Sequence, residues 1–497
     1  MRYLALCTDY DGTLATDGQV LPGTVTALEQ FLASGRRLVL VTGRELDDLV
    51  KVCPRLDLFE YVVAENGALL YKPSSGEITP LGPRPPSSFI ALLRQRGVGP
   101  ISVGRVIVAT WEPHESTVLS TIRDMGLELQ VIFNKGAVMI LPAGVNKATG
   151  LARALEQMEI SPHNTVGIGD AENDHALLAS CECSAAVANA LPTLKNAADI
   201  VTSMDHGAGV VQVIEEILRD DLASREPQLR RHHILLGTDD EGQEVRIPPH
   251  GESLLLVGSR DSGKSEFATG LLERLAVQGY TFCVIDVEGD YGSIAKAVAL
   301  GSPSRPPTAN EILKLLRSAD KSAVVNLSGL PEADRLPFLT TLTPRLAELR
   351  AHSGHPHWVT IDERITCCPP KAHPVSCCPW VREKACSTSL SVLRWWLGKS
   401  CGRRRCSLAL APRRRPCWMS SVRLGAWLAR TANSHRSRKM RPWCGVRDRT
   451  LNPSGSTSRR RNVTWYPEPQ RWRSVRQMLK DRFCELRRGA HACYTEM

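Results

Sequence analysis

Short apolar runs alternate with longer segments of helical periodicity through the first 218 residues. The runs LALC, RLVLVTG, YVVAENGALLY and VGIGD are rich in aliphatic and β-branched residues, which favours buried strands. Alternation of such strands with helical segments is typical of βαβ units, which build a parallel sheet. The pattern therefore predicts an α/β domain whose core spans residues 1–81 and 146–218.

A different pattern interrupts this domain between residues 82 and 145. The proline-rich segment GPRPPSSF breaks the alternation, and the strand-like runs ISVGRVIVATW and LELQVIFNKGAVMILP follow it. We expect a small α+β cap inserted into the core at this point.

A second set of apolar runs follows the charged segment RDDLASREPQLRRHH, so we expect a linker at residues 219–232. The runs SLLLVGS, YTFCVIDVEGDY, SAVVNLSGL and HWVTIDE are candidates for buried strands, and they alternate with helical segments. Residues 233–363 are therefore predicted to form a second α/β domain.

The charge is distributed unevenly over the 497 residues. Residues 1–363 carry 32 Lys and Arg against 46 Asp and Glu, a net charge of −14, whereas residues 364–497 carry 30 against 6, a net charge of +24. The overall charge of +10 is therefore no indication of nucleic-acid binding. The chain lacks an apolar run of the ~18–20 residues that a membrane span needs. Its start lacks the features of a secretory signal, and the cysteines of its first 363 residues form no paired framework. We therefore expect a cytoplasmic protein.

Two aspartates, Asp9 and Asp11, directly follow the first predicted strand. The carboxyl ends of parallel strands face the ligand crevice of an open sheet. Two carboxylates one residue apart can divide the work of binding a divalent metal and moving a proton. An acidic turn has the same sequence features, since Asp-x-Asp-Gly favours turns.

Companion residues at later strand ends favour a phosphate site over a simple turn. Thr42 ends the second strand and offers a hydroxyl to a phosphate oxygen, and Lys147 offers a positive charge near a helix start. Asp170, Asn173 and Asp174 follow a third strand and offer oxygen ligands for a hard cation. A surface lysine and an acidic helix N-cap would explain single residues, but not four motifs in this order.

This constellation resembles the haloacid dehalogenase (HAD) superfamily over residues 1–218, and specifically its Cof-like sugar-phosphatase branch with a large cap. The resemblance implies a Rossmann-like core in which Asp9 attacks phosphorus while Asp11 gives and takes the proton. Thr42 and Lys147 would hold the phosphoryl oxygens. The residues expected at a Mg²⁺ ion are Asp9, Asp11, Asp170 and Asp174. The expected function is that of a Mg²⁺-dependent phosphatase, acting through an aspartyl phosphate on a small phosphorylated substrate that the cap selects.

A second phosphate-binding motif opens the second domain. The segment LLLVGSRDSGKSEF matches G-x-x-x-x-G-K-S, from Gly258 through Gly263 to Lys264 and Ser265. Backbone N–H groups of such a loop cradle phosphates, the lysine reaches the β- and γ-phosphates, and the serine binds Mg²⁺. A strand before the motif and a helix after it favour this interpretation over a chance glycine-rich turn.

The strand HWVTIDE ends in Asp362 and Glu363 and resembles a Walker B strand, in which the Asp supports Mg²⁺ and the Glu orients the attacking water. A strand that simply ends in an acidic turn is the alternative. Together with VIDVEGDY, these motifs resemble the HerA–FtsK group of ATPases over residues 233–363. The resemblance implies an incomplete RecA-like domain that binds ATP and can form a homo-oligomer.

Two alternatives for the whole chain stay open. One is a DNA-associated ATPase with an accessory HAD domain, although the charge of residues 1–363 gives no support for DNA as a partner. The other is a polynucleotide kinase–phosphatase, which also joins a HAD domain to a P-loop. The predicted cap would obstruct a polynucleotide end, and the Asp362–Glu363 pair suits hydrolysis better than kinase transfer.

The tail, residues 364–497, shows neither helical nor strand periodicity, and we predict that it has no native fold. Zinc binding, disulfides and a basic nucleic-acid arm each fail to explain adjacent cysteines together with many arginines and tryptophans. A shift of reading frame explains them better. Residues 364–369 can be coded CGC ATC ACC TGC TGC CCC, and one restored G gives Ala-His-His-Leu-Leu-Pro, which continues the Walker B strand as IDEAHHLLP.

Overall fold

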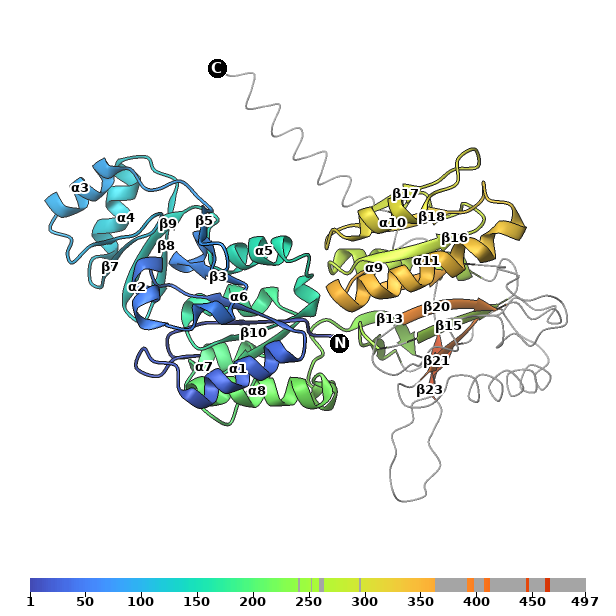
Figure 1. Ribbon diagram of the computed structural model, residues 1–497, viewed down its shortest axis with the longest axis horizontal. Helices are drawn as coiled ribbons and strands as arrows, with labels where there is room; N and C mark the ends of the chain where they lie inside the picture. Colours follow the sequence, from blue (N-terminus) through green and yellow to red (C-terminus); the bar gives the residue numbers. More distant parts are fainter. Residues whose placement is uncertain are drawn as a thin grey trace, which may run out of the picture.

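The computed structural model of the chain describes residues 1–362 with short gaps at 240–241, 252, 259–262 and 295 (Figure 1). It also describes the backbone of four strands in the tail, which are β20 (Ser391–Trp396), β21 (Cys406–Ala411), β22 (Cys444–Val446) and β23 (Arg461–Thr464). Glu363 and the remainder of the tail predicted to lack a native fold lie outside the described residues. No helix in the described part of the chain is long and apolar enough to cross a bilayer.

An eight-stranded sheet forms the centre of the first domain, in the order β12-β11-β10-β1-β2-β3-β4-β5. The first six strands of this order are parallel, and the last two add an antiparallel edge. The strands are β1 (Ala5–Thr8), β2 (Arg37–Val41), β3 (Tyr61–Ala64), β4 (Leu69–Lys72), β5 (Glu77–Pro80), β10 (Thr165–Gly169), β11 (Cys183–Ala186) and β12 (Ile200–Val201). Most of the parallel strands are buried along their whole length, which is typical of a sheet covered on both faces.

Helices cover both faces of this sheet and form two apolar cores (Figure 1). The helices on one face are α1 (Pro22–Ala33), α2 (Leu46–Val52), α7 (Pro192–Ala197) and α8 (His206–Asp220), and those on the other are α5 (Lys147–Gln157) and α6 (His175–Ser180). Alternate side chains of β1 show the division: Leu6 faces α1 and α8, whereas Cys7 faces α5. The structure thus has the α/β core that the pattern of apolar runs predicted.

The segment between β5 and α5 folds into a small α+β unit, the cap. Its antiparallel sheet has the order β6-β7-β9-β8. Its elements are α3 (Ser87–Gln95), β6 (Ser102–Val103), β7 (Val108–Trp111), α4 (Glu115–Asp124), β8 (Leu129–Asn134) and β9 (Ala137–Pro142). Both helices pack on one face of the cap sheet, while Ile107, Met139 and Leu141 pack against Ala68 of the core.

One buried carboxylate ties the cap to the core. Glu65, at the carboxyl end of β3, accepts hydrogen bonds from the backbone N–H groups of Arg105, Val106 and Ile107 at 2.8, 2.7 and 2.9 Å. A buried carboxylate is costly without such partners. These three bonds therefore hold residues 105–107 of the cap against the end of β3.

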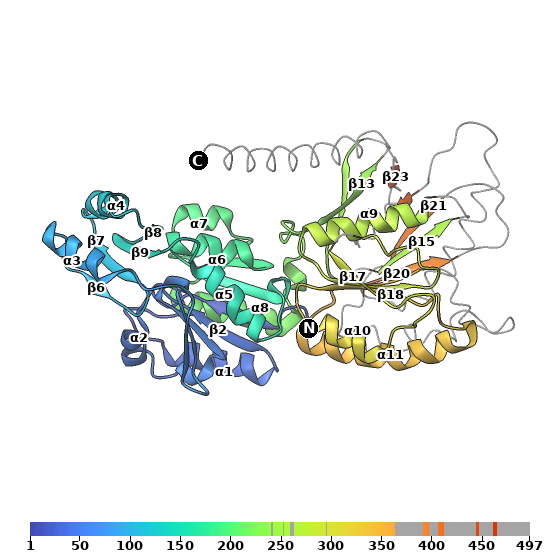
Figure 2. The ribbon, with the colours of Figure 1, turned by 90° about the horizontal axis from the view of Figure 1, so that it is seen from above.

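The second domain contains a seven-stranded sheet in the order β17-β18-β16-β19-β20-β15-β21. Its strands before the tail are β15 (Ser253–Gly258), β16 (Phe282–Asp286), β17 (Ala297–Leu300), β18 (Ser322–Asn326) and β19 (Trp358–Ile361). Helix α9 (Lys264–Val277) covers one face of this sheet, and α10 (Ala309–Leu316) and α11 (Glu332–Ser353) cover the other (Figure 2). The hairpin of β13 (Ile234–Asp239) and β14 (Glu244–Ile247) belongs to a separate small sheet, which β22 and β23 complete.

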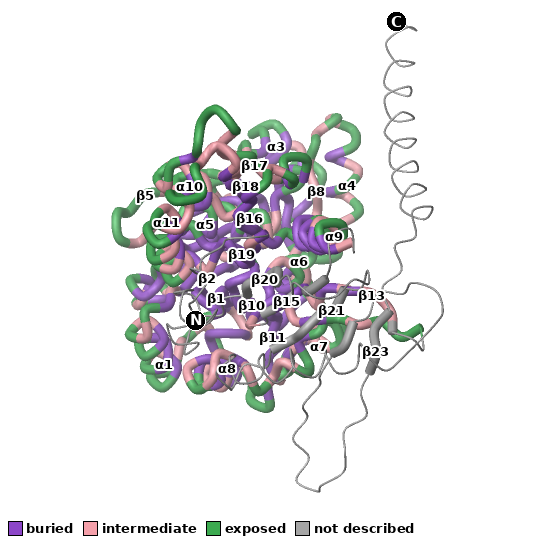
Figure 3. The backbone as a smooth tube through the Cα atoms, turned by 90° about the vertical axis from the view of Figure 1, so that its right-hand side faces the viewer, coloured by how far each residue is buried: buried purple, intermediate pink, exposed green. Residues whose placement is uncertain are grey.

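The two domains meet at the amino ends of their strands. In the first domain the contact residues include His163, in the turn before β10, and Glu182, directly before β11. In the second domain they include Gln278 and Tyr280, in the segment between α9 and β16. Seen along the long axis, buried segments lie in the centre of the view and exposed segments lie mostly around its rim (Figure 3). The carboxyl ends of both sheets, where ligand sites of α/β folds lie, therefore face away from the junction.

Gly150 of α5 is tightly packed, whereas Gly23 of α1 has open space around it. Comparing substitutions at the two glycines tests the packing of α5 against the core. A methyl group at Gly150 would lie 2.5 Å from Val63 Cγ1 and 2.7 Å from Gly67 Cα, whereas one at Gly23 of α1 would meet nothing within 4 Å. We expect Gly150→Ala to lower the free energy of unfolding of the first domain by about 1–3 kcal/mol. Gly23→Ala should leave it unchanged or raise it by up to about 1 kcal/mol. Pulse proteolysis in urea measures both, and equal effects of the two substitutions would contradict the packing described for α5.

Candidate active site

Strand ends and one helix start bring the predicted residues of the first domain to a single edge of the sheet. Asp9 directly follows β1, Thr42 follows β2 and Asp170 follows β10, while Lys147 is the first residue of α5. Because β1, β2 and β10 are adjacent and parallel, their carboxyl ends lie side by side. The start of α5 is fixed by a capping box in which Asn146 and Thr149 satisfy each other's backbone N–H groups.

A buried lysine forms the centre of the site. The Nζ atom of Lys147 lies 2.6 Å from Asp9 Oδ1 and 2.6 Å from Asp174 Oδ1, and its side chain is 1% exposed. Burial disfavours the ammonium, but the carboxylates of Asp174 and Asp9 outweigh burial and raise the pKa of Lys147. Lys147 is therefore a fixed positive charge beside the Asp9 carboxylate.

Asp174 positions its neighbours. Its Oδ2 accepts hydrogen bonds from the backbone N–H groups of Asp170 and Ala171, both at 3.0 Å, while its Oδ1 accepts from Lys147. Asp174 thus holds both the lysine and the turn after β10 in place. Asp174 is one of the residues expected from the sequence at a Mg²⁺ ion, and in the structure both of its oxygens accept hydrogen bonds from the protein.

Three buried carboxylates fit a hard divalent cation. Asp9, Asp170 and Asp174 each offer an oxygen within 4.8 Å of the others. Burial, with Asp174 and Asp170 adding to it and Lys147 opposing it, raises the pKa of Asp9 to about 7, and burial also raises the pKa of Asp170. The site therefore holds more negative charge than its buried lysine compensates, and an all-oxygen donor set of this kind suits Mg²⁺.

Asp11 lies outside this group of three carboxylates and pairs with an arginine instead. Arg44 donates to Asp11 through Nε at 2.7 Å and through Nη2 at 2.8 Å, and its Nη1 donates to Asp48 at 2.5 Å. The backbone N–H of Arg44 also donates to the buried Thr42 hydroxyl at 3.1 Å. The structure thus links Asp11 and Thr42 through one residue, Arg44, that the sequence analysis did not single out.

A lysine from the cap reaches the same site. Lys135 lies in the turn between β8 and β9, and its Nζ is 2.7 Å from Asp170 Oδ2 and 3.3 Å from the backbone oxygen of Asp11. Its side chain is 48% exposed, unlike that of Lys147. The Asn-Lys-Gly sequence signals a hairpin turn, but nothing in it indicates where that turn lies relative to the core. Sequence reasoning therefore missed Lys135.

The predicted phosphate loop of the second domain is described at its two ends. Gly258 ends β15, Gly263 has a φ of 87°, and the buried Lys264 begins α9, whereas residues 259–262 lie outside the described part. Asp362 follows β19 and is buried, and Glu363 is not described.

Tyr291 is buried near the predicted Walker B residue. Burial raises the pKa of Tyr291, and the Asp362 carboxylate adds to this rise. Asp286, in the VIDVEGDY segment, accepts hydrogen bonds from the backbone N–H groups of Gly289 and Tyr291 at 2.7 and 3.0 Å. Asp286 therefore closes the turn that places Tyr291 there.

Comparisons with known proteins concern the first domain. A family model described as haloacid dehalogenase-like hydrolase matches residues 6–103 and 117–214. The phosphoglycolate phosphatase of Methanothermobacter thermautotrophicus is 31% identical over 223 residues, which are 43% of this chain and 98% of that protein. The phosphoglycolate phosphatase of Halorubrum lacusprofundi is 32% identical over 219 residues, 41% of this chain and 95% of that protein.

Solved structures with a similar arrangement include a haloacid dehalogenase-like hydrolase from Bacteroides thetaiotaomicron. It is 20% identical, with a TM-score of 0.39, and the match covers 43% of this chain and 99% of that one.

Proposed function

The chain belongs to the haloacid dehalogenase-like hydrolases, and we propose that its first domain is a Mg²⁺-dependent phosphatase that acts through an aspartyl phosphate on Asp9. It is a phosphoric monoester hydrolase of small phosphorylated substrates. The observation that carries the proposed mechanism is the buried Lys147 ammonium, held between Asp9 and Asp174 at the carboxyl edge of the sheet. This places a fixed positive charge beside the carboxylate that would attack phosphorus.

The residues of this site divide the work of phosphoryl transfer. A carboxylate oxygen of Asp9 attacks phosphorus and the ester oxygen leaves, after which water hydrolyses the aspartyl phosphate and restores the carboxylate. Lys147 and Thr42 orient the phosphoryl oxygens. Asp9 and Asp170 would hold Mg²⁺, which would neutralise charge on the phosphoryl group. Asp174 keeps Lys147 and the turn between β10 and Asp174 in position.

Asp11 is proposed to move the proton. It would protonate the leaving oxygen and later deprotonate the attacking water, as a general acid and base. In the structure both of its oxygens accept hydrogen bonds from Arg44, at 2.7 and 2.8 Å. One of these bonds would have to open for an oxygen of Asp11 to reach the substrate, so we propose that Arg44 positions this residue.

The substrate is proposed to be a small phosphorylated acid. Besides the buried Lys147, the mouth of the site presents the two partly exposed cations Lys135 and Arg44, which suit a second anionic group on the substrate. The curated relatives that match this domain are phosphoglycolate phosphatases, and phosphoglycolate carries such a carboxylate. The sequence predicted only a small phosphorylated substrate; a neutral sugar carrying one phosphate would lack this second charge.

For the second domain we propose ATP binding at the loop between β15 and α9. The buried Lys264 at the start of α9 and the buried Asp362 directly after β19 support a phosphate and Mg²⁺ site there. The resemblance to the HerA–FtsK group suggests a homo-oligomer as a further proposal. It leaves open whether ATP is hydrolysed, and the charge of residues 1–363 gives no support for an association with DNA.

The first prediction concerns the attacking carboxylate. Asp9→Asn keeps the shape of the side chain but removes the nucleophile, so phosphatase turnover should fall by at least about 10³-fold. Asp57→Asn, a change of an exposed carboxylate on the same domain, should leave turnover unchanged. Release of inorganic phosphate from phosphoglycolate, with and without a Mg²⁺ chelator, measures both effects. Turnover that survives Asp9→Asn would overturn the proposed aspartyl phosphate.

A second prediction concerns the choice of substrate. Lys135→Ala should raise KM for phosphoglycolate about tenfold or more, because a charge-assisted hydrogen bond to the carboxylate is lost. The kinetic constants for p-nitrophenyl phosphate, which has no carboxylate, should change little. Lys51→Ala, an exposed lysine of α2, is the matched control. An equal loss for both substrates would instead place Lys135 at the phosphoryl group.

A third prediction separates the two domains. Lys264→Ala should weaken binding of a fluorescent ATP analogue by about tenfold or more and leave phosphatase turnover unchanged. Lys314→Ala, an exposed lysine of α10, should affect neither. Binding of the analogue that is insensitive to Lys264 would argue against a phosphate site at the start of α9.

A further inference from the structure

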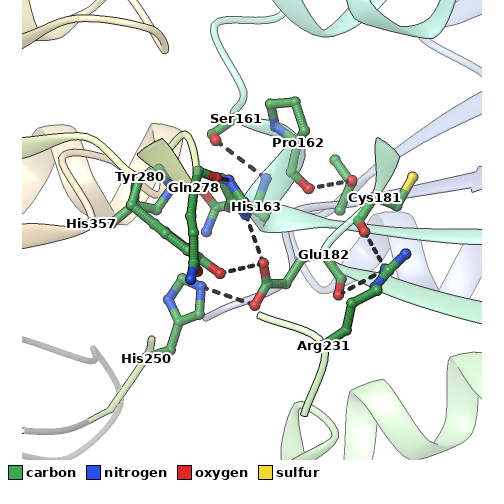
Figure 4. A network of polar contacts seen from close by, with 12 residues as sticks. Ser161, Pro162, His163, Cys181, Glu182, Arg231, His250, Gln278, Tyr280 and His357 are labelled. Carbon is green, nitrogen blue, oxygen red and sulfur yellow. Dashed lines mark hydrogen bonds and ion pairs between the residues drawn. The ribbon is translucent and has the colours of Figure 1, made fainter. Parts of the chain in front are cut away.

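Two buried carboxylates of the first domain, Glu182 and Asp170, pair with cations in different ways. At the junction, Glu182 lies among side chains of both domains (Figure 4), and Arg2, which pairs with it at 2.9 Å, has a side chain that is 5% exposed. At the carboxyl edge of the sheet, Lys135 pairs with Asp170 at 2.7 Å, and its side chain is 48% exposed. A cation that is half exposed keeps much of its contact with water, so Lys135 can leave its carboxylate at a smaller cost than Arg2.

The contacts of Lys135 join the cap to the loops of the candidate active site. Its Nζ lies 3.3 Å from the backbone oxygen of Asp11, and its backbone N–H donates to Glu172 Oε2 at 3.4 Å. A methyl group at Gly12 would lie 2.7 Å from the same Nζ, so the lack of a side chain at Gly12 makes room for the lysine. The tip of the cap hairpin, in the turn between β8 and β9, therefore rests on the loops that follow β1 and β10.

Asp170 has little room for a second cation while Lys135 is bound to it. Its Oδ1 accepts a hydrogen bond from the Thr13 hydroxyl at 3.1 Å and its Oδ2 accepts one from Lys135, so both oxygens have a partner. The side chain of Asp170 is 3% exposed. A Mg²⁺ ion held by Asp170 would therefore stand beside the Lys135 ammonium, and positive charges at this range repel each other.

The other lysine of the site is held far more firmly. Lys147 is 1% exposed and lies between Asp9 and Asp174, with its Nζ 2.6 Å from an oxygen of each. Separating it from these partners would leave a buried charge without compensation, which is costly. Of the two lysines, Lys135 is therefore the cation that leaves when Asp170 takes a divalent ion.

We propose that Lys135 competes with Mg²⁺ for Asp170, and that it turns from this carboxylate to the substrate once the site has bound the metal. The inference rests on the proposed phosphatase function, because it takes Asp170 as a residue that holds Mg²⁺. It adds an order of events: the cap lysine is free for the carboxylate of a phosphorylated acid only after Asp170 has exchanged one cation for the other. The buried hydrogen bonds from residues 105–107 to Glu65 keep the cap attached during this exchange.

The affinity for Mg²⁺ tests the competition directly. It is measured by calorimetric titration of Mg²⁺ into the full chain, freed of divalent ions and without substrate. Lys135→Met removes the charge and keeps an unbranched side chain, so it should bind Mg²⁺ at least about fivefold more tightly than the wild-type chain. Lys135→Arg keeps the charge and should bind Mg²⁺ with nearly the wild-type affinity. Lys51→Ala, a change of an exposed lysine of α2, is the matched control and should leave the affinity unchanged.

One further variant separates this proposal from the proposed function. Asp170→Asn should weaken Mg²⁺ binding at least about tenfold, because it removes a carboxylate ligand. If Asp170→Asn binds Mg²⁺ like the wild-type chain, the metal site is misplaced and both proposals fail. Binding that depends on Asp170 but not on the charge at Lys135 leaves the phosphatase proposal standing and overturns the competition alone.

Chemical labelling follows the lysine itself in the wild-type chain, so it does not depend on whether the variants fold. An amine-reactive acetylating reagent, followed by peptide mass spectrometry, should modify Lys135 at least about twofold faster with Mg²⁺ than with a chelator at equal ionic strength, because its ion pair with Asp170 has opened. The rate at Lys51 is the internal reference and should not change.

Three results would contradict the competition. One is a Lys135→Met chain that binds Mg²⁺ no more tightly than the wild type. Another is a Lys135→Arg chain that gains as much affinity as Lys135→Met, which would show that the shape of the side chain matters and not its charge. The third is a labelling rate at Lys135 that stays the same, or falls, when the wild-type chain is saturated with Mg²⁺.

Discussion

The buried ion pair of Lys147 with Asp9 and Asp174 is the constraint on which the first domain depends. An ammonium with 1% exposure is tolerated only where carboxylates compensate the loss of water, so both aspartates must be within hydrogen-bond distance. That requirement fixes the start of α5, which the capping box of Asn146 sets, and the depth of α5 against the sheet, which Gly150 and Gly67 permit. Together with Asp170, these two carboxylates carry more negative charge than Lys147 compensates, which fits the proposed Mg²⁺ site.

The site residues whose proximity could be predicted from the sequence are those that directly follow a parallel strand. Asp9, Thr42 and Asp170 each come directly after a parallel strand, so their proximity could be inferred from the order of the motifs. Lys147 could be placed only as a charge near a helix start, because nothing in the sequence shows that its side chain is buried. Arg44 and Lys135 could not be foreseen, since their roles depend on the geometry of a turn and on how the cap sits on the core.

The junction between the domains was less accessible to sequence reasoning than either site. His163, Glu182, Gln278 and Tyr280 belong to no motif, and they are brought together only when two separate sheets meet. The charged segment at residues 219–232 was predicted only as a linker. In the structure its last residue, His232, has its ring edge-on to that of His163 in the polar interface between the domains. Buried polar clusters of this kind specify one relative placement, because each unpaired member carries a desolvation cost.

The back-to-back packing of the two sheets has a consequence for how the two proposed sites could influence each other. With both carboxyl edges facing outward, a phosphate released at the first site would leave on the side of the molecule away from the proposed nucleotide site. An influence between the sites would then be energetic, transmitted by α9 and the junction rather than by a shared intermediate. Such coupling is reciprocal: if nucleotide at the second domain altered ligand affinity at the first, ligand at the first would alter nucleotide affinity by the same factor.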